Sequence, residues 1–175
     1  MTTTLTNEVY HEEIPFLVAK IVAIFMGVLS IIFLILLLIQ ISGTPIGDNP
    51  PPDWMYLILI AVFLGATWLV YNLKVLTISI NESLIKVAYG RISYSITFEN
   101  IETATIDTNP GILYGGWGIR LAKIGGESAL IYNVISKPRV ILKLRSGRFK
   151  QFAFSTKQPE EIIQLINPSS KIKSR

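Results

Sequence analysis

Two long apolar runs dominate the first half of the chain, from Phe16 to Ile41 and from Trp54 to Leu73. At about 1.5 Å of rise per residue, helices of these lengths would measure roughly 39 Å and roughly 30 Å, against a hydrocarbon core of about 30 Å. Both runs therefore predict transmembrane helices. The connection from Ser42 to Asp53 is rich in Gly, Pro and Asp, which is typical of a short polar turn between two helices.

The residues before the first run distinguish an anchor from a cleaved signal. A signal peptide has a basic start, a short apolar stretch and a small-residue cleavage site. Residues 1–15 instead contain three glutamates and no Lys or Arg, and Pro15 suits the first turn of a helix. We predict an N-terminal tail over 1–15 and an uncleaved helical hairpin over 16–73, with helices at about 16–41 and 54–73.

Small residues recur at a spacing of four within both predicted helices: Ala19, Ala23 and Gly27 in the first, Ala61 and Gly65 in the second. Such residues let helix backbones approach closely inside a membrane. Two explanations are open: the two helices pack on each other within the hairpin, or the small residues form the contact face of a homo-oligomer.

After Lys74 the pattern changes to short alternating runs of β-branched and aromatic residues, separated by turn residues, at a spacing of about ten. This pattern is typical of an antiparallel β domain. The runs are KVLTISI, LIKVAYG, RISYSITF, ETATID, GIRLAKI, SALIYN, RVILKL and FKQFAFS. An acidic first turn at Pro159-Glu160-Glu161 and an apolar stripe through Ile166 predict one closing helix. We assign the β domain to 74–168 and a basic tail to 169–175.

Strands closed by one amphipathic helix form the layout of a pleckstrin-homology-like (PH-like) β roll or barrel. The segment from about Lys74 to Ile166 resembles the PH-like domains of small bacterial and archaeal membrane proteins, which often follow transmembrane helices directly. The likeness is carried by Gly116-Trp117-Gly118-Ile119-Arg120, Ile131-Tyr132-Asn133, Ser146-Gly147-Arg148 and Pro159-Glu160-Glu161. The resemblance implies the fold and assigns no catalytic residue to any position.

Charge is distributed unevenly along the chain. Of sixteen Lys and Arg residues, fifteen follow the second apolar run, beginning with Lys74, and the other is Lys20. Because positively charged segments stay in the cytoplasm, we expect a multi-pass protein of the cell membrane with both termini cytoplasmic. The basic C-terminal part also suits an anionic inner leaflet.

The residue inventory argues against an enzyme. The chain has no cysteine, and its one histidine, His11, lies in the N-terminal tail, outside the expected β domain. A catalytic triad or histidine metal site in that domain is therefore not expected. Glu99 and Glu102 are expected to face solvent. The glycines of Tyr114-Gly-Gly-Trp-Gly-Ile-Arg120 lead into a strand, so they do not form a nucleotide-binding loop. We expect no cofactor and no metal.

A turn signal at Asn109-Pro110-Gly111 precedes apolar and aromatic residues that have two explanations. A membrane-proximal loop would place Ile112, Leu113, Tyr114 and Trp117 in the headgroup layer, where Trp and Tyr are favoured. In the other explanation Trp117 closes one end of the β roll and its glycine neighbours adopt positive φ angles.

The strongest candidate site is the basic segment from Lys143 to Lys150. If Ser146-Gly147 is a two-residue turn, Arg145 faces Arg148 and Lys143 faces Lys150, while Leu144 pairs with Phe149. Like charges in direct opposition cost stability, so four cations on one face suggest an anionic partner. Arg120 is a further candidate, either in an ion pair with a glutamate or in an anion site.

These features favour a membrane-anchored, non-enzymatic module. Its expected ligands are anionic lipid headgroups of the inner membrane surface or an acidic partner protein. The alternative is an accessory or assembly subunit of a larger membrane protein complex. Nucleic acid is not expected, because exposed aromatic residues are not interleaved with the basic ones.

Overall fold

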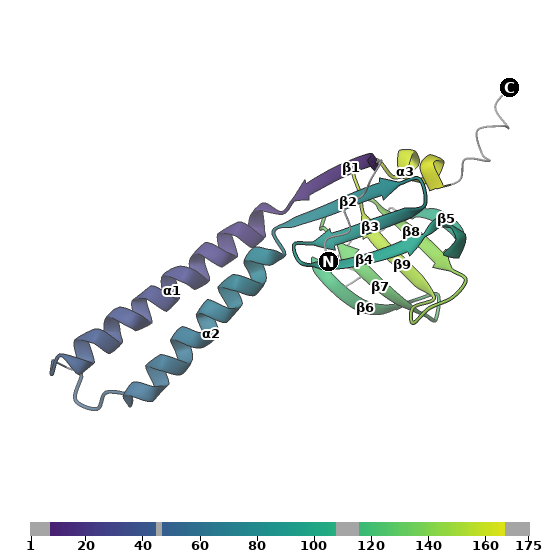
Figure 1. The fold of residues 1–175 in the computed structure, drawn as a ribbon. Helices are drawn as coiled ribbons and strands as arrows, with labels where there is room; N and C mark the ends of the chain where they lie inside the picture. Colours follow the sequence, from purple (N-terminus) through teal and green to yellow (C-terminus); the bar gives the residue numbers. More distant parts are fainter. Residues whose placement is uncertain (1–7, 45–46, 108–115, 167–175) are drawn as a thin grey trace, which may run out of the picture. The chain divides into compact units, whose positions relative to one another are not determined.

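The computed structural model describes residues 8–44, 47–107 and 116–166. The chain divides into two compact units: a helical hairpin, Phe16–Lys74, and a β unit that combines Met1–Pro15 with Val75–Arg175. Figure 1 shows the ribbon coloured along the sequence. The hairpin is thus an insertion into the β unit, between its first and second strands.

The hairpin consists of α1 (Leu17–Ile41) and α2 (Asp53–Asn72), in agreement with the predicted ranges to within one residue. Both helices are long and apolar enough to cross a membrane. The Gln40 side chain closes the connecting turn by donating to the Pro51 carbonyl at 2.8 Å and to the Asp53 carboxylate. At the other end of the hairpin, the Phe16 N–H donates to the Lys74 carbonyl at 2.8 Å.

The small residues of the two helices have different surroundings. Ala19 and Ala23 of α1 are buried, and a Cβ atom added at Gly27 would lie 3.9 Å from Thr67 of α2. Packing within the hairpin therefore explains the small residues of α1. Ala61 and Gly65 of α2 are exposed, so packing within the hairpin does not explain them.

The β unit contains two sheets, with strand orders β1-β2-β3-β4 and β5-β8-β9-β7-β6. All pairs are antiparallel except β7 with β9. Each alternating run predicted after Lys74 is a strand. The strands are β1 (Glu8–Pro15), β2 (Val75–Asn81), β3 (Leu84–Tyr89), β4 (Ile92–Thr97), β5 (Ile101–Asp107), β6 (Gly118–Ile124), β7 (Glu127–Asn133), β8 (Arg139–Leu144) and β9 (Gln151–Ser155). The described residues form no closed barrel, in contrast to one of the expected forms.

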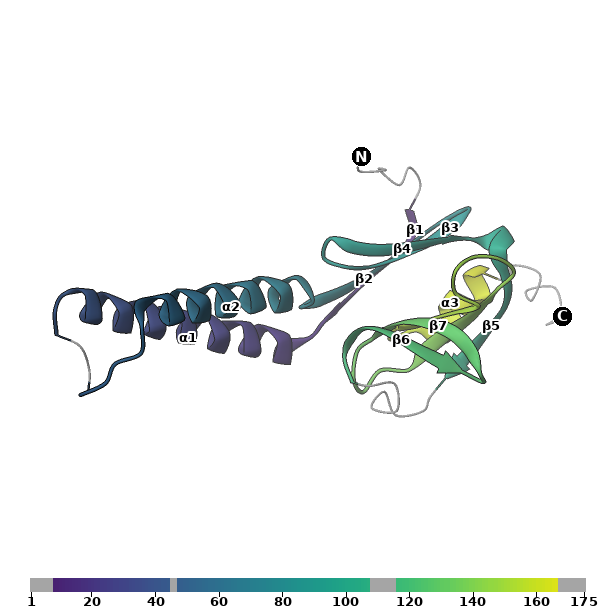
Figure 2. The same ribbon diagram turned by 90° about the horizontal axis from the view of Figure 1, so that it is seen from below.

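Figure 2 shows the two sheets as separate layers. Aromatic residues join them: Tyr89 of β3 stacks on Tyr132 of β7 with ring centroids 5.9 Å apart, and Tyr94 of β4 packs on Phe152 of β9 at 5.0 Å. The predicted closing helix is α3 (Pro159–Ile166), which buries Ile162 and contacts β5 and β8. The core thus lies between the sheets and under α3.

The N-terminal segment corrects the sequence analysis, because residues 8–15 are not a separate tail. They form β1, which pairs with β2 from Glu8 opposite Asn81 to Pro15 opposite Val75. Pro15 ends this strand and is not part of α1. The alternation was hidden because the second of its three inward positions, Tyr10, Glu12 and Ile14, carries a glutamate.

The buried Glu12 carboxylate is satisfied by hydrogen bonds. It accepts from the hydroxyl groups of Tyr10 at 2.9 Å and Thr156 at 2.6 Å, and from the backbone N–H of Lys157 at 2.7 Å. Buried charge is tolerated when its lone pairs are used in this way. These bonds also tie β1 to the segment that leads into α3.

Candidate functional site

The predicted β8–β9 turn is wrong by one residue in register. Lys143 lies opposite Gln151, not opposite Lys150, and the Leu144 N–H donates to the Lys150 carbonyl at 2.8 Å. Residues 145–150 form a six-residue loop instead of a two-residue turn. The expected opposition of Arg145 with Arg148 and the pairing of Leu144 with Phe149 therefore do not form.

Asn100, in the short 3-10 helix η1 (Phe98–Asn100), explains the wider loop. Its amide group donates to the Ser146 carbonyl at 3.0 Å and accepts from the Ser146 N–H and hydroxyl, both at 2.9 Å. Its carbonyl accepts from the Arg145 N–H at 2.9 Å. The conformation of the loop is thus set by contacts with Asn100, which is 46 residues away from Ser146 in sequence, and not by local turn preferences.

We call Arg145, Arg148 and Lys150 the basic loop; all three are exposed. The Arg148 guanidinium lies 5.5 Å from the centroid of the Phe149 ring. Lys143 stands at the base of the loop and forms an ion pair with Glu102 of β5 at 3.6 Å. Within the described ranges, the three basic-loop cations form no ion pair, whereas Lys143 is partly neutralised.

One further cation lies beside the basic loop and was missed in the sequence. The Lys150 N–H donates to the Ser128 carbonyl at 3.0 Å, and Ser128 is the register partner of Lys123 on β6. Lys123 is exposed. In the sequence Lys123 is only one position of an alternating run. That pattern does not show that β6 and the basic loop both contact Ser128 of β7.

Arg120 does not belong to this group. It is exposed on β6, an edge strand that β7 and β9 separate from β8. Its neighbour Leu121 is 67% exposed and does not face the core. Arg120 is therefore an isolated surface cation in the described part of the chain.

The basic loop lies at the end of the β unit remote from the helix connections. β2 begins at Val75, where the chain leaves the hairpin, and its second residue, Leu76, pairs with Tyr89 of β3. The Tyr89 hydroxyl donates to the carbonyl of Asn133, the last residue of β7. The other end of β7 holds Ser128, which accepts the Lys150 N–H. Because β7 has seven residues, roughly 20 Å separate these ends. We call them the attached end and the free end.

The attached end carries apolar and aromatic residues together with cations. Ile92 follows the β3–β4 turn and is 47% exposed, and Ile135 follows β7 and is 41% exposed. Arg91 directly precedes Ile92, and Lys137 follows Ile135 by two residues. The half-buried Trp117 immediately precedes β6 at this end, where Gly118 pairs with Asn133.

Trp117 stands between Gly116 and Gly118, whose φ angles of +86° and +99° favour glycine. The expectation that these glycines serve positive φ angles is confirmed. The remaining residues of the expected membrane-proximal loop, Ile112, Leu113 and Tyr114, lie outside the described residues.

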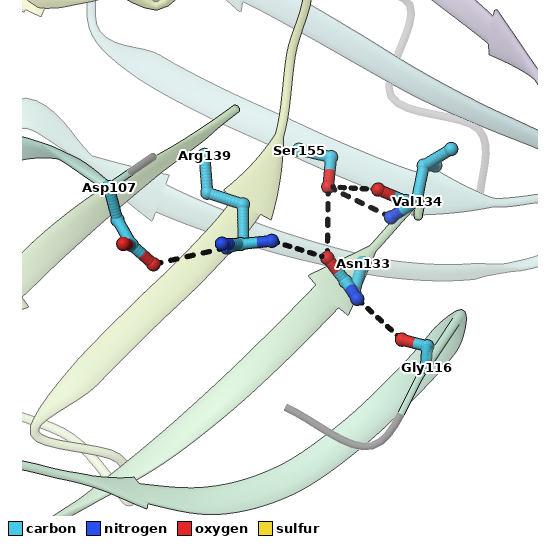
Figure 3. A network of polar contacts seen from close by, with 6 residues as sticks. All are labelled: Asp107, Gly116, Asn133, Val134, Arg139 and Ser155. Carbon is cyan, nitrogen blue, oxygen red and sulfur yellow. Dashed lines mark hydrogen bonds and ion pairs between the residues drawn. The ribbon is translucent and has the colours of Figure 1, made fainter. Parts of the chain in front are cut away.

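A buried polar network holds the residues on either side of the segment 108–115 (Figure 3). The Arg139 Nε lies 3.2 Å from Asp107 Oδ2, and its Nη1 donates to Asn133 Oδ1 at 3.1 Å. Asn133 in turn donates to the Gly116 carbonyl. Asp107 and Gly116 directly flank the segment, so the network fixes both of its ends.

Ser155 of β9 completes this network. Its hydroxyl accepts from the Val134 N–H at 2.8 Å and lies 3.2 Å from both Asn133 Oδ1 and the Val134 carbonyl. Arg139, Asn133 and Ser155 are fully buried. No local pattern in the sequence indicates this cluster, because its members come from the ends of four strands.

His11 is the other chemical group whose position differs from expectation, because β1 brings it into the β unit. Its Nδ1 lies 2.8 Å from Glu8 Oε1 and 3.3 Å from the Ser79 hydroxyl. Ser79 and Glu8 share one ring nitrogen, whereas a proton relay needs a serine and a carboxylate hydrogen-bonded to opposite nitrogens; the Glu13 carboxylate beside Nε2 lies 3.8 Å away, beyond hydrogen-bond distance. No group of three metal-ligating side chains occurs among the residues with described positions.

This cluster predicts a pH dependence of stability. The hydrogen bond with Glu8 raises the pKa of His11 above 6.5, so its contribution is present below 6.5 and is lost as pH rises through the raised pKa. Hydrogen bonds from Ser79 and His11 lower the pKa of Glu8 below 4.5, so its contribution is lost only in more acidic solution. We therefore expect the cluster to stabilise the fold most between about pH 4.5 and 6.5.

Melting of the full chain in mild detergent, at pH 5.5 and pH 8.5, measures this effect. The wild-type chain is expected to lose more stability between these values than the His11→Gln variant, which keeps a hydrogen-bonding side chain and does not titrate. Equal pH dependence in the two chains would show that His11 is uncoupled from folding.

Comparison of the chain with family models, with curated proteins and with solved structures found no match.

Proposed function

We propose that the chain is a membrane-anchored, non-enzymatic binding module whose basic loop holds an acidic surface of a partner protein. The observation that carries this proposal is the position of the basic loop, at the free end of the β unit. The helices connect to the other end without a linker, at Pro15 and Val75. The loop lies roughly 20 Å along the β unit from that connection, and its three exposed cations form no ion pair among the described residues, so they are available to an acidic partner.

The pairing of β1 with β2 supports the proposed topology. Because Pro15 and Val75 are register partners, both ends of the hairpin must emerge on the same side of a membrane that the helices cross. The fifteen Lys and Arg residues from Lys74 onward favour the cytoplasm for that side. This places both termini in the cytoplasm in our proposal.

The attached end supplies the membrane-facing surface in this proposal. Exposed Ile92 and Ile135 lie within two residues of Arg91 and Lys137, a combination that suits the headgroup layer. Trp117 at the same end suits the layer as well. The lipid contact expected from the sequence is thereby assigned to the attached end instead of the basic loop.

We further interpret the β unit as a variant of the PH-like fold. Two packed sheets followed by a terminal helix support this interpretation. The additional strand β1 and the parallel pairing of β7 with β9 are departures from the antiparallel roll that the resemblance implied. A partner held at the free end would make the chain an accessory subunit of a membrane complex, the alternative that the sequence left open.

Site-specific photo-crosslinking in intact membranes tests the two ends separately. A photoreactive residue at Glu99, which is exposed next to Asn100, reports on the basic loop without removing a cation. A second one at Ile92 reports on the attached end. We expect protein adducts from position 99 and lipid adducts from position 92.

The triple substitution of Arg145, Arg148 and Lys150 by Gln is expected to abolish the protein adducts. All three side chains are exposed, so each change should alter stability by less than about 0.5 kcal/mol. Substituting Lys86, Arg120 and Lys157 by Gln removes the same charge elsewhere on the β unit and serves as the matched control. Lipid adducts at position 99 would refute the partner proposal and return the basic loop to the anionic membrane surface.

A further inference from the structure

A groove of about 520 Å³ lies within the helical hairpin and does not involve the β unit. This volume is within the range of roughly 300 to 1,000 Å³ that is common for small-molecule sites. Most of its wall is aliphatic, and both of its cations stand toward one end. The lining residues are Lys20, Ala23, Ile24, Gly27, Val28, Ile31, Thr67, Tyr71 and Lys74.

The wall of the groove suits a hydrocarbon chain. Ile24, Val28 and Ile31 of α1 are exposed or half-exposed along it, at intervals of one helical turn. Gly27 leaves the space beside them open, since a Cβ atom there would meet only Thr67 at 3.9 Å. The Thr67 hydroxyl donates to the Phe63 carbonyl at 2.8 Å, so it needs no partner from the groove.

The two lysines lie at the same end of the hairpin. Phe16 donates its N–H to the Lys74 carbonyl, and Lys20 follows Phe16 by about one helical turn. The Lys74 ammonium group lies 3.4 Å from the centroid of the Tyr71 ring. The only acidic residues of the hairpin, Asp48 and Asp53, belong to the other end, at the turn between the helices.

We propose that this groove binds a phospholipid with an anionic headgroup, whose phosphate contacts Lys20 and Lys74 and whose acyl chain follows Ile24, Val28 and Ile31. A cation inside a membrane span needs a partner, and basic pockets between helices on the cytoplasmic side suit anionic headgroups. This inference rests on the membrane span in the proposed function. It is independent of the basic loop and of its partner.

A second copy of the chain fits the groove less well. In a parallel two-fold dimer the same surface of both copies would meet, which brings Lys20 and Lys74 of one copy near those of the other. Like charges at this distance inside a membrane are costly, and the hairpin has no acidic residue at this end to offset them. The charge pattern therefore favours an anionic lipid as the occupant.

Native mass spectrometry of the full chain in mild detergent measures lipid retention directly. The probes are phosphatidylglycerol and phosphatidylcholine with identical acyl chains. We expect preferential retention of phosphatidylglycerol, reduced about fivefold by Lys20→Gln or Lys74→Gln and roughly thirtyfold by both. The double variant Lys86→Gln, Arg120→Gln removes the same charge from the β unit and is expected to retain the lipid.

A second pair of variants tests the apolar part of the groove. Gly27→Ala places a methyl group at ordinary contact distance from Thr67 and is expected to leave lipid retention unchanged. Gly27→Leu fills the groove and is expected to reduce the retention of both lipids, although both lysines remain. Helicity by circular dichroism verifies that the hairpin is intact. If Gly27→Leu unfolds it, the lysine variants decide the question.

Equal retention of the two lipids by the wild-type chain would overturn the proposal, as would full retention by the double lysine variant. Carbonate extraction of membranes separates this failure from a failure of the proposed function. A chain that remains in the membrane without lipid preference refutes only the lipid site. A chain released by carbonate refutes the membrane span and the lipid site together.

Discussion

Replacement of Arg139 by methionine is expected to lower the free energy of unfolding by about 3 to 5 kcal/mol. Arg139 is fully buried and lies 3.2 Å from Asp107, so the substitution leaves a buried carboxylate without its cationic partner. The Asn133 amide oxygen also loses a donor. Urea denaturation in mild detergent measures the change. Replacing Trp54 and Trp68 by Phe would leave Trp117 as the only tryptophan, whose fluorescence can be excited selectively.

Lys143→Met is the matched control for this prediction. Lys143 is on the same strand and also forms an ion pair, with Glu102 at 3.6 Å. The side chains of Lys143 and Glu102 are both nearly half-exposed. Exposed ion pairs contribute about 0 to 1 kcal/mol, so the control is expected to lose no more than that. Similar losses from both substitutions would contradict the structural role assigned to the buried pair.

A double substitution separates charge from packing at this position. Arg139→Met combined with Asp107→Leu removes both charges, and replacement of a buried ion pair by apolar residues is often close to neutral. The double variant is therefore expected to be more stable than Arg139→Met alone. Because Asp107 and Gly116 flank the segment 108–115, these variants also test whether the network positions Trp117.

The features that the sequence predicted correctly are those with local signals. The two apolar helices were visible from length and hydropathy, and β2 to β9 from alternation over five to seven residues. α3 was visible from its acidic first turn and apolar stripe. Each of these patterns is contained in one stretch of consecutive residues.

The features that the sequence did not predict depend on contacts between distant segments. The inward position of Glu12 hid β1, because the three partners that satisfy a buried carboxylate include Thr156 and Lys157, far away in the chain. The β8–β9 register depended on Asn100. Placing the basic loop at the free end required the β2–β3 register and the hydrogen bonds of β7 with Tyr89 and Lys150, which no single pattern contains.

The largest expected effect concerns β1, and a chain without the helices is expected to fold if β1 is retained. In the structure the Phe16 N–H donates to the Lys74 carbonyl, the bond that flanks a two-residue hairpin loop. Replacing residues 17–73 with Asn-Gly, a favoured pair for such loops, would join β1 directly to β2. We expect a water-soluble β unit with a cooperative melting transition.

A chain that begins at Val75 is expected not to fold cooperatively. It loses the buried side chains of Tyr10 and Ile14, each worth about 2 to 5 kcal/mol, together with the hydrogen bonds made by Glu12. That sum is comparable to the whole stability of a typical domain, about 5 to 15 kcal/mol. The loss of β1 also exposes the β2 edge, which favours aggregation.

Circular dichroism melting and size-exclusion chromatography of the two chains compare them directly. Equal melting temperatures would mean that residues 75–166 are self-sufficient and that β1 is only an accessory strand. The expected difference would show that the β unit needs both β1 and β2, the strands on either side of the hairpin. The β unit would then form only when both ends of the hairpin lie on one side of the membrane.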